Sequence, residues 1–258
     1  MMRPWGYCVI GLEQISPGRF RSVRPMPKQD FAVWPESFSF RRGDCVRFGC
    51  RPVQTTRPHV EDLQSFDLVS AGHSVSEQDL IECLRKAEVA QNLEELFGCT
   101  TQARHDRGAL WVNPADASRS ICGCEYINVR FHLWADPAGF KLRADLALAA
   151  NERVPSIPVV DREWRRFFGQ LCRRIGECDP HSFSERFLNC KFRPERWPEP
   201  PIRSFTEKFL NGQVRNALLG DTSRFARIGL PRPRNDQRCW LMLDSLFPQP
   251  KESWLDLP

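Results

Sequence analysis

The chain has 258 residues, of which 41% are hydrophobic and 27% charged, and its formal net charge is +5. These values are typical of a folded globular protein and exclude a disordered, fibrous or collagen-like chain. The longest apolar run, Leu146–Ala150, is far shorter than the about 20 residues of a membrane-spanning helix, and the first residues lack the apolar stretch of a secretory signal. We therefore expect a cytoplasmic protein without membrane contact.

The first half of the chain predicts β-structure followed by a helix. The expected strands cover residues 7–12, 19–24, 44–48 and 109–112. The Pro-Gly turn of Ser16–Gly18 should join the first two strands as a hairpin. A helix is expected at about 76–97, because Ser74–Glu77 fits a capping box and apolar residues then recur at helical spacing. Gly98 is a suitable residue to end this helix.

The second half predicts more strands around one amphipathic helix. The expected strands cover residues 126–134, 140–148, 157–160, 225–230 and 239–243. In the first of these, alternation predicts one side formed by Ile127, Val129, Phe131 and Leu133. A helix over about 161–175 begins at Asp161, a good capping residue. Its apolar stripe runs from Trp164 to Ile175, and its arginines gather on the opposite face.

Three strands, a helix and two further strands is the order of an OB barrel, a five-stranded and partly open Greek-key barrel. The first half has roughly the same order. We therefore expect a β-rich α+β protein made of two small OB-like barrels with intervening α-helices. The N-terminal barrel should span residues 1–113 and the C-terminal barrel residues 114–258. The C-terminal barrel should carry an inserted Pro-rich and helical segment at about 177–222.

Metal and catalytic motifs are weak in this sequence. Eleven cysteines cannot all pair, and in a cytoplasmic protein they indicate reduced, buried thiols. Four potential metal ligands lie close in sequence, but their spacing matches no common zinc module: Cys172, Cys178, His181 and Cys190. Gly-rich phosphate loops, a nucleophile elbow and a complete zinc-deaminase signature are missing. We therefore assign no catalytic residue, metal or cofactor, and an enzyme without a recognised motif stays an open alternative.

Basic and aromatic residues on the predicted strands form the remaining candidate site. Arg accounts for 31 of the 37 basic residues, and its guanidinium group binds phosphate and stacks on planar groups, although a GC-rich genome also explains this excess. Single-stranded nucleic acid is bound by aromatic side chains beside a positive groove, whereas aromatics of a small barrel also fill its core. The candidate nucleic-acid-binding residues are Arg19, Phe20, Arg21, Arg24, Arg47, Arg130 and Trp134. Alternation places Arg130 and Trp134 on one face beside His132.

Several segments together resemble the dual OB domain family of bacterial proteins. The segments that carry the resemblance are Tyr7–Gly11, Gly18–Pro25, Gly43–Phe48, Arg57–Asp62, Ile157–Trp164, Ala226–Pro233 and Arg238–Leu243. The resemblance implies two OB barrels, a nucleic-acid or nucleotide ligand and a bacterial defence or conflict context, and it implies no catalytic residue. The chain departs from the family where Arg162, instead of proline, follows Asp161.

These observations predict non-catalytic recognition of single-stranded nucleic acid or a nucleotide. The alternative is a protein-interaction adaptor, because a barrel fold alone does not decide function. A protein partner would then contact the Pro-rich stretch at 177–203 and the arginine face of the helix at 161–175.

Overall fold

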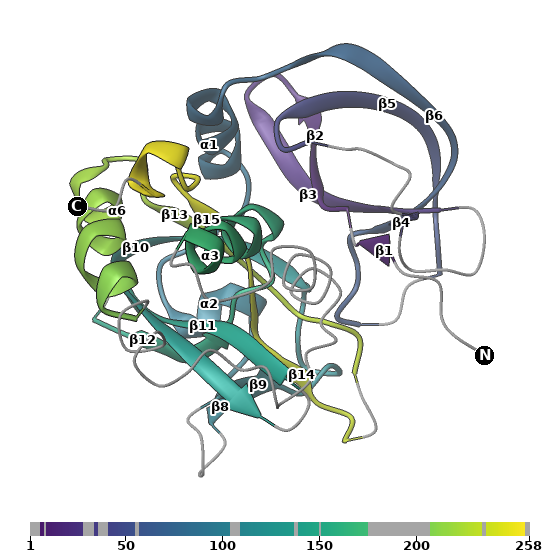
Figure 1. Ribbon diagram of the computed structural model, residues 1–258. Helices are drawn as coiled ribbons and strands as arrows, with labels where there is room; N and C mark the ends of the chain where they lie inside the picture. Colours follow the sequence, from purple (N-terminus) through teal and green to yellow (C-terminus); the bar gives the residue numbers. More distant parts are fainter. Residues whose placement is uncertain are drawn as a thin grey trace.

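The computed structural model describes residues 6–7, 9–27, 34–35, 41–54, 57–103, 109–136, 139–149, 151–174, 207–233 and 236–255. These residues form a β-rich α+β fold with four sheets and a few short helices (Figure 1). The predicted fold class is confirmed at this level. Within the same residues, every helix is too short or too polar to cross a membrane.

The first sheet has the strand order β2-β3-β6-β5. Its strands are β2 (Gly11–Ser16), β3 (Arg19–Met26), β5 (Asp44–Pro52) and β6 (Asp62–Ser74). The predicted hairpin is confirmed, since β2 and β3 pair across a turn in which Gly18 has φ of 72°, a left-handed value that glycine adopts without strain. β3 and β6 are parallel, with Arg24 opposite Asp62. A separate pair consists of β1 (Gly6–Tyr7) and β4 (Trp34–Pro35).

The prediction of one helix over 76–97 is wrong. The chain instead forms α1 (Glu77–Arg85), the short strand β7 (Val89–Ala90) and α2 (Leu93–Phe97). Val89 and Ala90 pair in parallel with β10, so the sheet takes the backbone groups that a continuous helix would need.

Side-chain caps define the ends of these two helices. Ser76, and not Ser74, caps α1, because its hydroxyl accepts a hydrogen bond from the Asp79 N–H at 3.1 Å. Asn92 caps α2 by accepting from the Glu95 N–H at 2.9 Å. Gly98 ends α2 with φ of 66°, as the sequence predicted.

The second sheet holds most of the core. Its strands are β10 (Ile121–Asp136), β11 (Gly139–Leu148), β12 (Arg153–Pro158), β13 (Phe225–Gly229) and β15 (Met242–Phe247). Their order is β12-β11-β10-β13-β15, and all of these neighbours are antiparallel. The long β10 pairs with β13 at its start and with β11 along the rest of its length.

The two outer strands of this sheet approach each other at one point. Just after β12, Val159 forms an isolated parallel bridge with Leu243 of β15. The Val160 N–H also donates to the Leu243 carbonyl at 2.9 Å. The contact is a single bridge and not a ladder, so the described strands stop short of a closed barrel.

A β-bulge changes the predicted alternation in β10. Its pairing with β11 shifts between Tyr126 and Asn128. Ile127 is therefore 45% exposed, whereas Val129 and Phe131 face the core as predicted. Tyr126 is buried in place of Ile127, and its hydroxyl donates to the Phe247 carbonyl at 2.8 Å.

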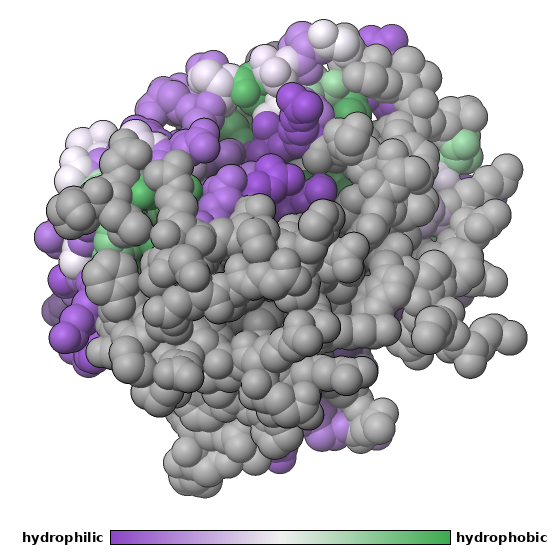
Figure 2. All heavy atoms as spheres, viewed as in Figure 1, coloured by the Kyte–Doolittle hydropathy of each residue, from purple (hydrophilic) through white to green (hydrophobic). Residues whose placement is uncertain are grey.

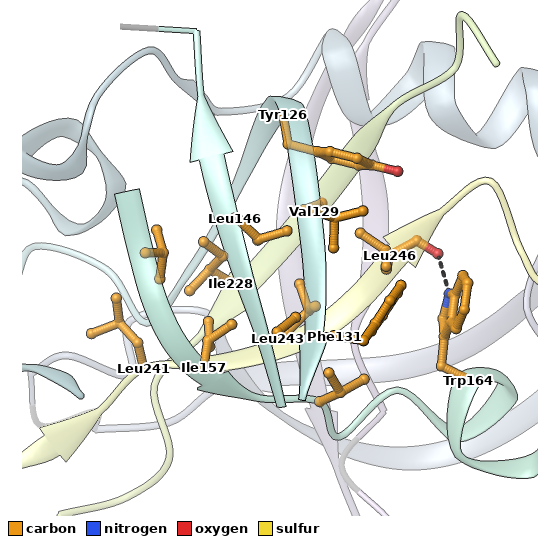
Figure 3. Packing of buried hydrophobic residues seen from close by; sticks show 14 of the residues in the cluster. Tyr126, Val129, Phe131, Leu146, Ile157, Trp164, Ile228, Leu241, Leu243 and Leu246 are labelled. Atoms are coloured by element: carbon orange, nitrogen blue, oxygen red, sulfur yellow. Dashed lines mark hydrogen bonds between the residues drawn. The ribbon is translucent and has the colours of Figure 1, made fainter. Parts of the chain in front are cut away.

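α3 (Arg162–Arg174) covers the core of the second sheet. Its predicted apolar stripe is confirmed for the described side chains, which are buried at Trp164, Phe167, Phe168 and Leu171. The Trp164 ring stacks on Phe131 with 5.2 Å between ring centroids, and its Nε1–H donates to the Leu246 carbonyl at 3.0 Å (Figure 3). A buried indole is thus both packed and hydrogen-bonded.

Three short strands and three short helical segments complete the described chain. The strands β8 (Gln102–Ala103), β9 (Leu110–Val112) and β14 (Cys239–Trp240) form a small sheet. The π-helical turn η2 (Leu210–Val214) leads into α6 (Arg215–Gly220), and the 3₁₀ turn η3 (Glu252–Leu255) lies near the C-terminus. Gly212 lies within η2, where the α-helical hydrogen-bond pattern is lost.

Asn211 in η2 satisfies the free edge of β10. Its Oδ1 accepts from the Phe131 N–H at 2.6 Å, and its Nδ2 donates to the Phe131 carbonyl at 2.8 Å. Replacing Asn211 by Ala should lower the free energy of unfolding by about 1–3 kcal/mol, because both backbone groups lose their partner. Urea denaturation would measure this loss, with the exposed Gln213→Ala as control. Equal stability of the two variants would contradict this role.

α1 packs between the two sheets (Figure 1). Its Ile81 and Leu84 are buried in a cluster with Phe225 and Phe247 of the second sheet, and Leu12 of β2 packs against the same cluster. A helix expected to belong to the N-terminal barrel therefore also contacts the C-terminal sheet. The proposed domain boundary after residue 113 stays a prediction.

Charged side chains form a second connection between the sheets. Asp62 is buried and pairs with Arg24 at 2.5 Å and with Arg232 at 3.1 Å. The neighbouring Glu61 accepts hydrogen bonds from the Ser120 N–H at 2.8 Å and from its hydroxyl at 2.7 Å. Hydrophilic side chains gather in the region where α1 and α3 face the first sheet (Figure 2).

Candidate nucleic-acid interface

The outer face of β10, β11 and β12 carries polar side chains. Leu142, Ala144 and Leu146 of β11 are buried, so the residues between them point away from the core. The register places Arg130 opposite Asp145 and His132 opposite Arg143. Arg153 of β12 lies opposite Ala147 on the same face.

Hydrogen bonds fix the centre of this face. His132 Nε2 lies 2.8 Å from Asp145 Oδ2, and Asp145 Oδ1 accepts from the Ser156 N–H at 2.7 Å. Arg143 Nη1 donates to the Ser156 carbonyl at 2.7 Å and to its hydroxyl oxygen at 3.3 Å. Ser156 has φ of 49°, a left-handed conformation that is unusual for serine, and these contacts hold it there.

Two exposed arginines border the fixed centre. Arg130 and Arg153 are both exposed, and Arg143, two residues before Asp145 on β11, is partly buried. The backbone positions of these three arginines therefore lie on the same face as Asp145, on three neighbouring strands. Trp134 lies opposite Lys141 in the register, and the side chains of both residues lie outside the described part of the chain, so the predicted shared face stays a prediction.

The residues predicted on the first sheet lie at separate positions. Arg19 and Arg21 are exposed on β3, with Arg21 paired to Glu13 at 2.7 Å, and Phe20 between them is partly buried. Arg47 is exposed on β5, and β6 lies between β5 and β3 in the sheet. The sequence predicted these residues as parts of one binding site, but the strand order separates Arg47 from the residues of β3.

Arg24 is placed differently from the other predicted arginines. Only 8% of its side chain is exposed, and it forms the buried ion pair with Asp62. Its guanidinium group therefore has an internal partner and a structural role at the junction of the sheets. Sequence alternation could not reveal this, because Asp62 arrives from another strand.

Sequence reasoning missed part of the outer face. The alternation of β11 could have predicted that Arg143 points away from the core, because it lies between two apolar positions that face the core. Arg153 begins a strand that was predicted to start only at Ile157. The left-handed backbone of Ser156 has no sequence signal, since it depends on contacts to Arg143 and Asp145.

Metal binding and thiol chemistry receive no support from the described side chains. These side chains include no group of three or more His, Cys, Asp or Glu that could hold a metal ion. The candidate ligands Cys178, His181 and Cys190 lie outside the described residues, as does the side chain of Cys172. Burial raises the pKa of Cys122 to about 11, and burial likewise raises that of Cys124. Both thiols therefore stay protonated and unreactive at neutral pH.

Comparison with protein-family models, with curated proteins and with solved structures finds no match. The relation to the dual OB domain family therefore stays a prediction from sequence motifs. Strand order, charge and side-chain placement are the observations on which a function can be proposed.

Proposed function

We propose that the second sheet is an OB-like unit that recognises single-stranded nucleic acid, or a nucleotide, without catalysis. The strand order supports this proposal, because β10 pairs with both β11 and β13 and the end of β12 meets β15. This connectivity is consistent with a partly open five-stranded barrel. α3 follows the third strand, β12, in the order that the sequence predicted.

The observation that carries the proposal is the charge on the outer face. In OB barrels, the face of the second and third strands and the adjoining loops bind oligonucleotides. The corresponding strands here are β11 and β12, and together with β10 they present Arg130, Arg143 and Arg153. Guanidinium groups spaced across three neighbouring strands suit the phosphates of an extended single strand.

Loss of the two exposed arginines should weaken binding and its dependence on salt. The Arg130→Ala, Arg153→Ala double variant should bind short single-stranded DNA and RNA at least about tenfold more weakly at low salt. The slope of log affinity against log salt should shrink by about 1.4, since each phosphate contact contributes about 0.7 for single strands. Fluorescence anisotropy over a salt series measures both quantities.

The matched control is Arg162→Ala, Arg166→Ala on α3, which removes the same charge from exposed positions of another element. If the two double variants lose the same affinity, net charge explains the binding and the interface is wrongly placed. If the wild-type protein binds no single strand at any salt, the proposed function fails.

The adaptor remains the alternative function. Its two predicted contact surfaces are the stretch 177–203, which lies outside the described residues, and the α3 face where Arg162 and Arg166 are exposed. A partner protein that stays bound after nuclease treatment, and that Arg162→Glu releases, would favour the adaptor.

A further inference from the structure

The first sheet carries an exposed aromatic ring that the sequence analysis did not single out. Phe66 of β6 is 51% exposed. Its ring lies against Gly49 of β5, where an added Cβ would be only 2.2 Å from the Phe66 Cε2 atom. The glycine backbone thus supports one side of the ring, and half of the side chain stays open to solvent.

A hydrogen-bonded arginine lies on the same face of the sheet as this ring. The Nε and Nη2 groups of Arg51 donate to the Gln64 Oε1 atom at 2.8 and 2.6 Å. Phe66 lies at a β-bulge of β6, but its ring covers the side of Gly49 on which a Cβ would project. Gly49 and Arg51 are two residues apart on β5, so the ring and the Arg51 side chain lie on the same face of the sheet. Gln64 and Arg51 are also opposite each other in the register of β5 and β6.

Within the described part of the chain, the hydrogen bonds of the Arg51 side chain are to the neutral amide of Gln64. Among the described residues, no carboxylate pairs with Arg51, whereas Arg21 on the same sheet pairs with Glu13. An amide that orders a guanidinium group without neutralising it prepares that group to bind an anion. An open aromatic ring on the same face as such a cation suits a ligand that is planar and anionic.

We infer that Phe66 and Arg51 form a nucleotide subsite on the first sheet. One base of a single strand stacks on the open side of Phe66, and an adjoining phosphate accepts hydrogen bonds from Arg51. Stacking on an aromatic side chain tolerates any base, and guanidinium contacts follow the backbone. The inference rests on the proposed function for its ligand class and adds a second, base-binding contact to the phosphate contacts of the second sheet.

The test compares Phe66→Leu with wild type on two labelled strands of equal length, one of which carries abasic sites. On the strand with bases, Phe66→Leu should lower affinity about 5- to 150-fold, the loss expected for one stacked base. On the abasic strand the two proteins should bind equally, because the phosphates are unchanged. Phe66→Trp should keep the wild-type affinity, and Ile15→Ala, at another exposed apolar position of the sheet, should have no effect.

Photocross-linking of wild-type protein to a strand containing 5-iodouracil gives a readout that needs no variant. The cross-linked peptide should contain Phe66. Normal affinity of Phe66→Leu together with cross-links elsewhere overturns the subsite, while binding that still depends on Arg130 and Arg153 leaves the proposed function standing. Loss through Phe66→Leu but not through those arginines supports the subsite and overturns the interface on the second sheet. A wild-type protein that binds neither strand overturns both.

Discussion

Replacing Asp161 by Ala should lower the free energy of unfolding by about 3–5 kcal/mol. Asp161 is 1% exposed and accepts from the N–H groups of Glu163 and Leu246, each at 2.9 Å. Its carboxylate also pairs with Arg42 at 2.7 Å, and only 16% of the Arg42 side chain is exposed. The substitution removes a helix cap, leaves a backbone donor of β15 without its partner and leaves a nearly buried cation uncompensated.

Urea denaturation at neutral pH measures this loss. Glu163→Ala is the matched control, because it removes a carboxylate of the same helix whose pairing with Arg166 is exposed, and it should change stability by less than about 0.5 kcal/mol. Asp161→Asn should fall between the two, since the amide can still cap the helix but cannot pair with Arg42. A loss below about 1.5 kcal/mol for Asp161→Ala would show that Arg42 finds solvent or another anion.

The ion pair with Arg42 also explains why Asp161 does more than the sequence predicted. Local sequence alone predicted Asp161 as the capping residue before the apolar stripe of α3. Arg42 precedes Asp161 by 119 residues in the chain, and Leu246 follows it by 85 residues. Local patterns therefore predicted the helix, whereas the connection between the two sheets depends on contacts that no local pattern encodes.

The same limit explains the wrong helix over 76–97. The start of α1 and the glycine that ends α2 both have local signals. Val89 and Ala90 become a strand because β10 offers a parallel edge more than thirty residues later in the chain. Tertiary pairing thus overrides the local helical preference at these two residues.

In the candidate interface too, local sequence predicted the placement of some residues and not of others. Arg130 was predicted on an exposed strand face, and the alternation of β10 places it there. Arg24 was predicted by the same reasoning, yet β3 passes beside β6 at that residue and Asp62 becomes its partner. Exposure of a strand residue depends on which element packs against it, and the strand's own sequence does not contain that information.

His59 should make the protein progressively less stable in acid. It is 3% exposed, and neither of its ring nitrogens has a hydrogen-bond partner among the described residues. Burial, reinforced by the positive charges of Arg24 and Arg232, lowers the pKa of His59 to about 3 from its ordinary value of about 6.5. Below about pH 6.5 the unfolded chain binds a proton at His59 that the folded protein does not bind.

The free energy of unfolding should therefore fall by about 1.4 kcal/mol for each pH unit between about 6 and 3.5. Burial raises the pKa of Asp244 and of Glu77, and carboxyls with raised pKa values contribute stability at low pH that is lost as pH rises. Their effect has the opposite sign, so a single stability curve does not isolate His59.

The comparison of wild type with His59→Leu removes this ambiguity, because the carboxyls are common to both proteins. At pH 7 the variant should be as stable as wild type or more so, since leucine fills similar space without unpaired polar atoms. As pH falls, the difference should grow in favour of the variant by about 1.4 kcal/mol per unit. Urea denaturation at half-unit steps from pH 7 to 4 measures it, and NMR of the His59 ring protons reports its protonation directly. If the free energies of unfolding of the two proteins change in parallel with pH, or if the His59 ring protonates near pH 6 in the folded protein, the prediction is wrong. His59 would then have a hydrogen-bond partner or access to solvent.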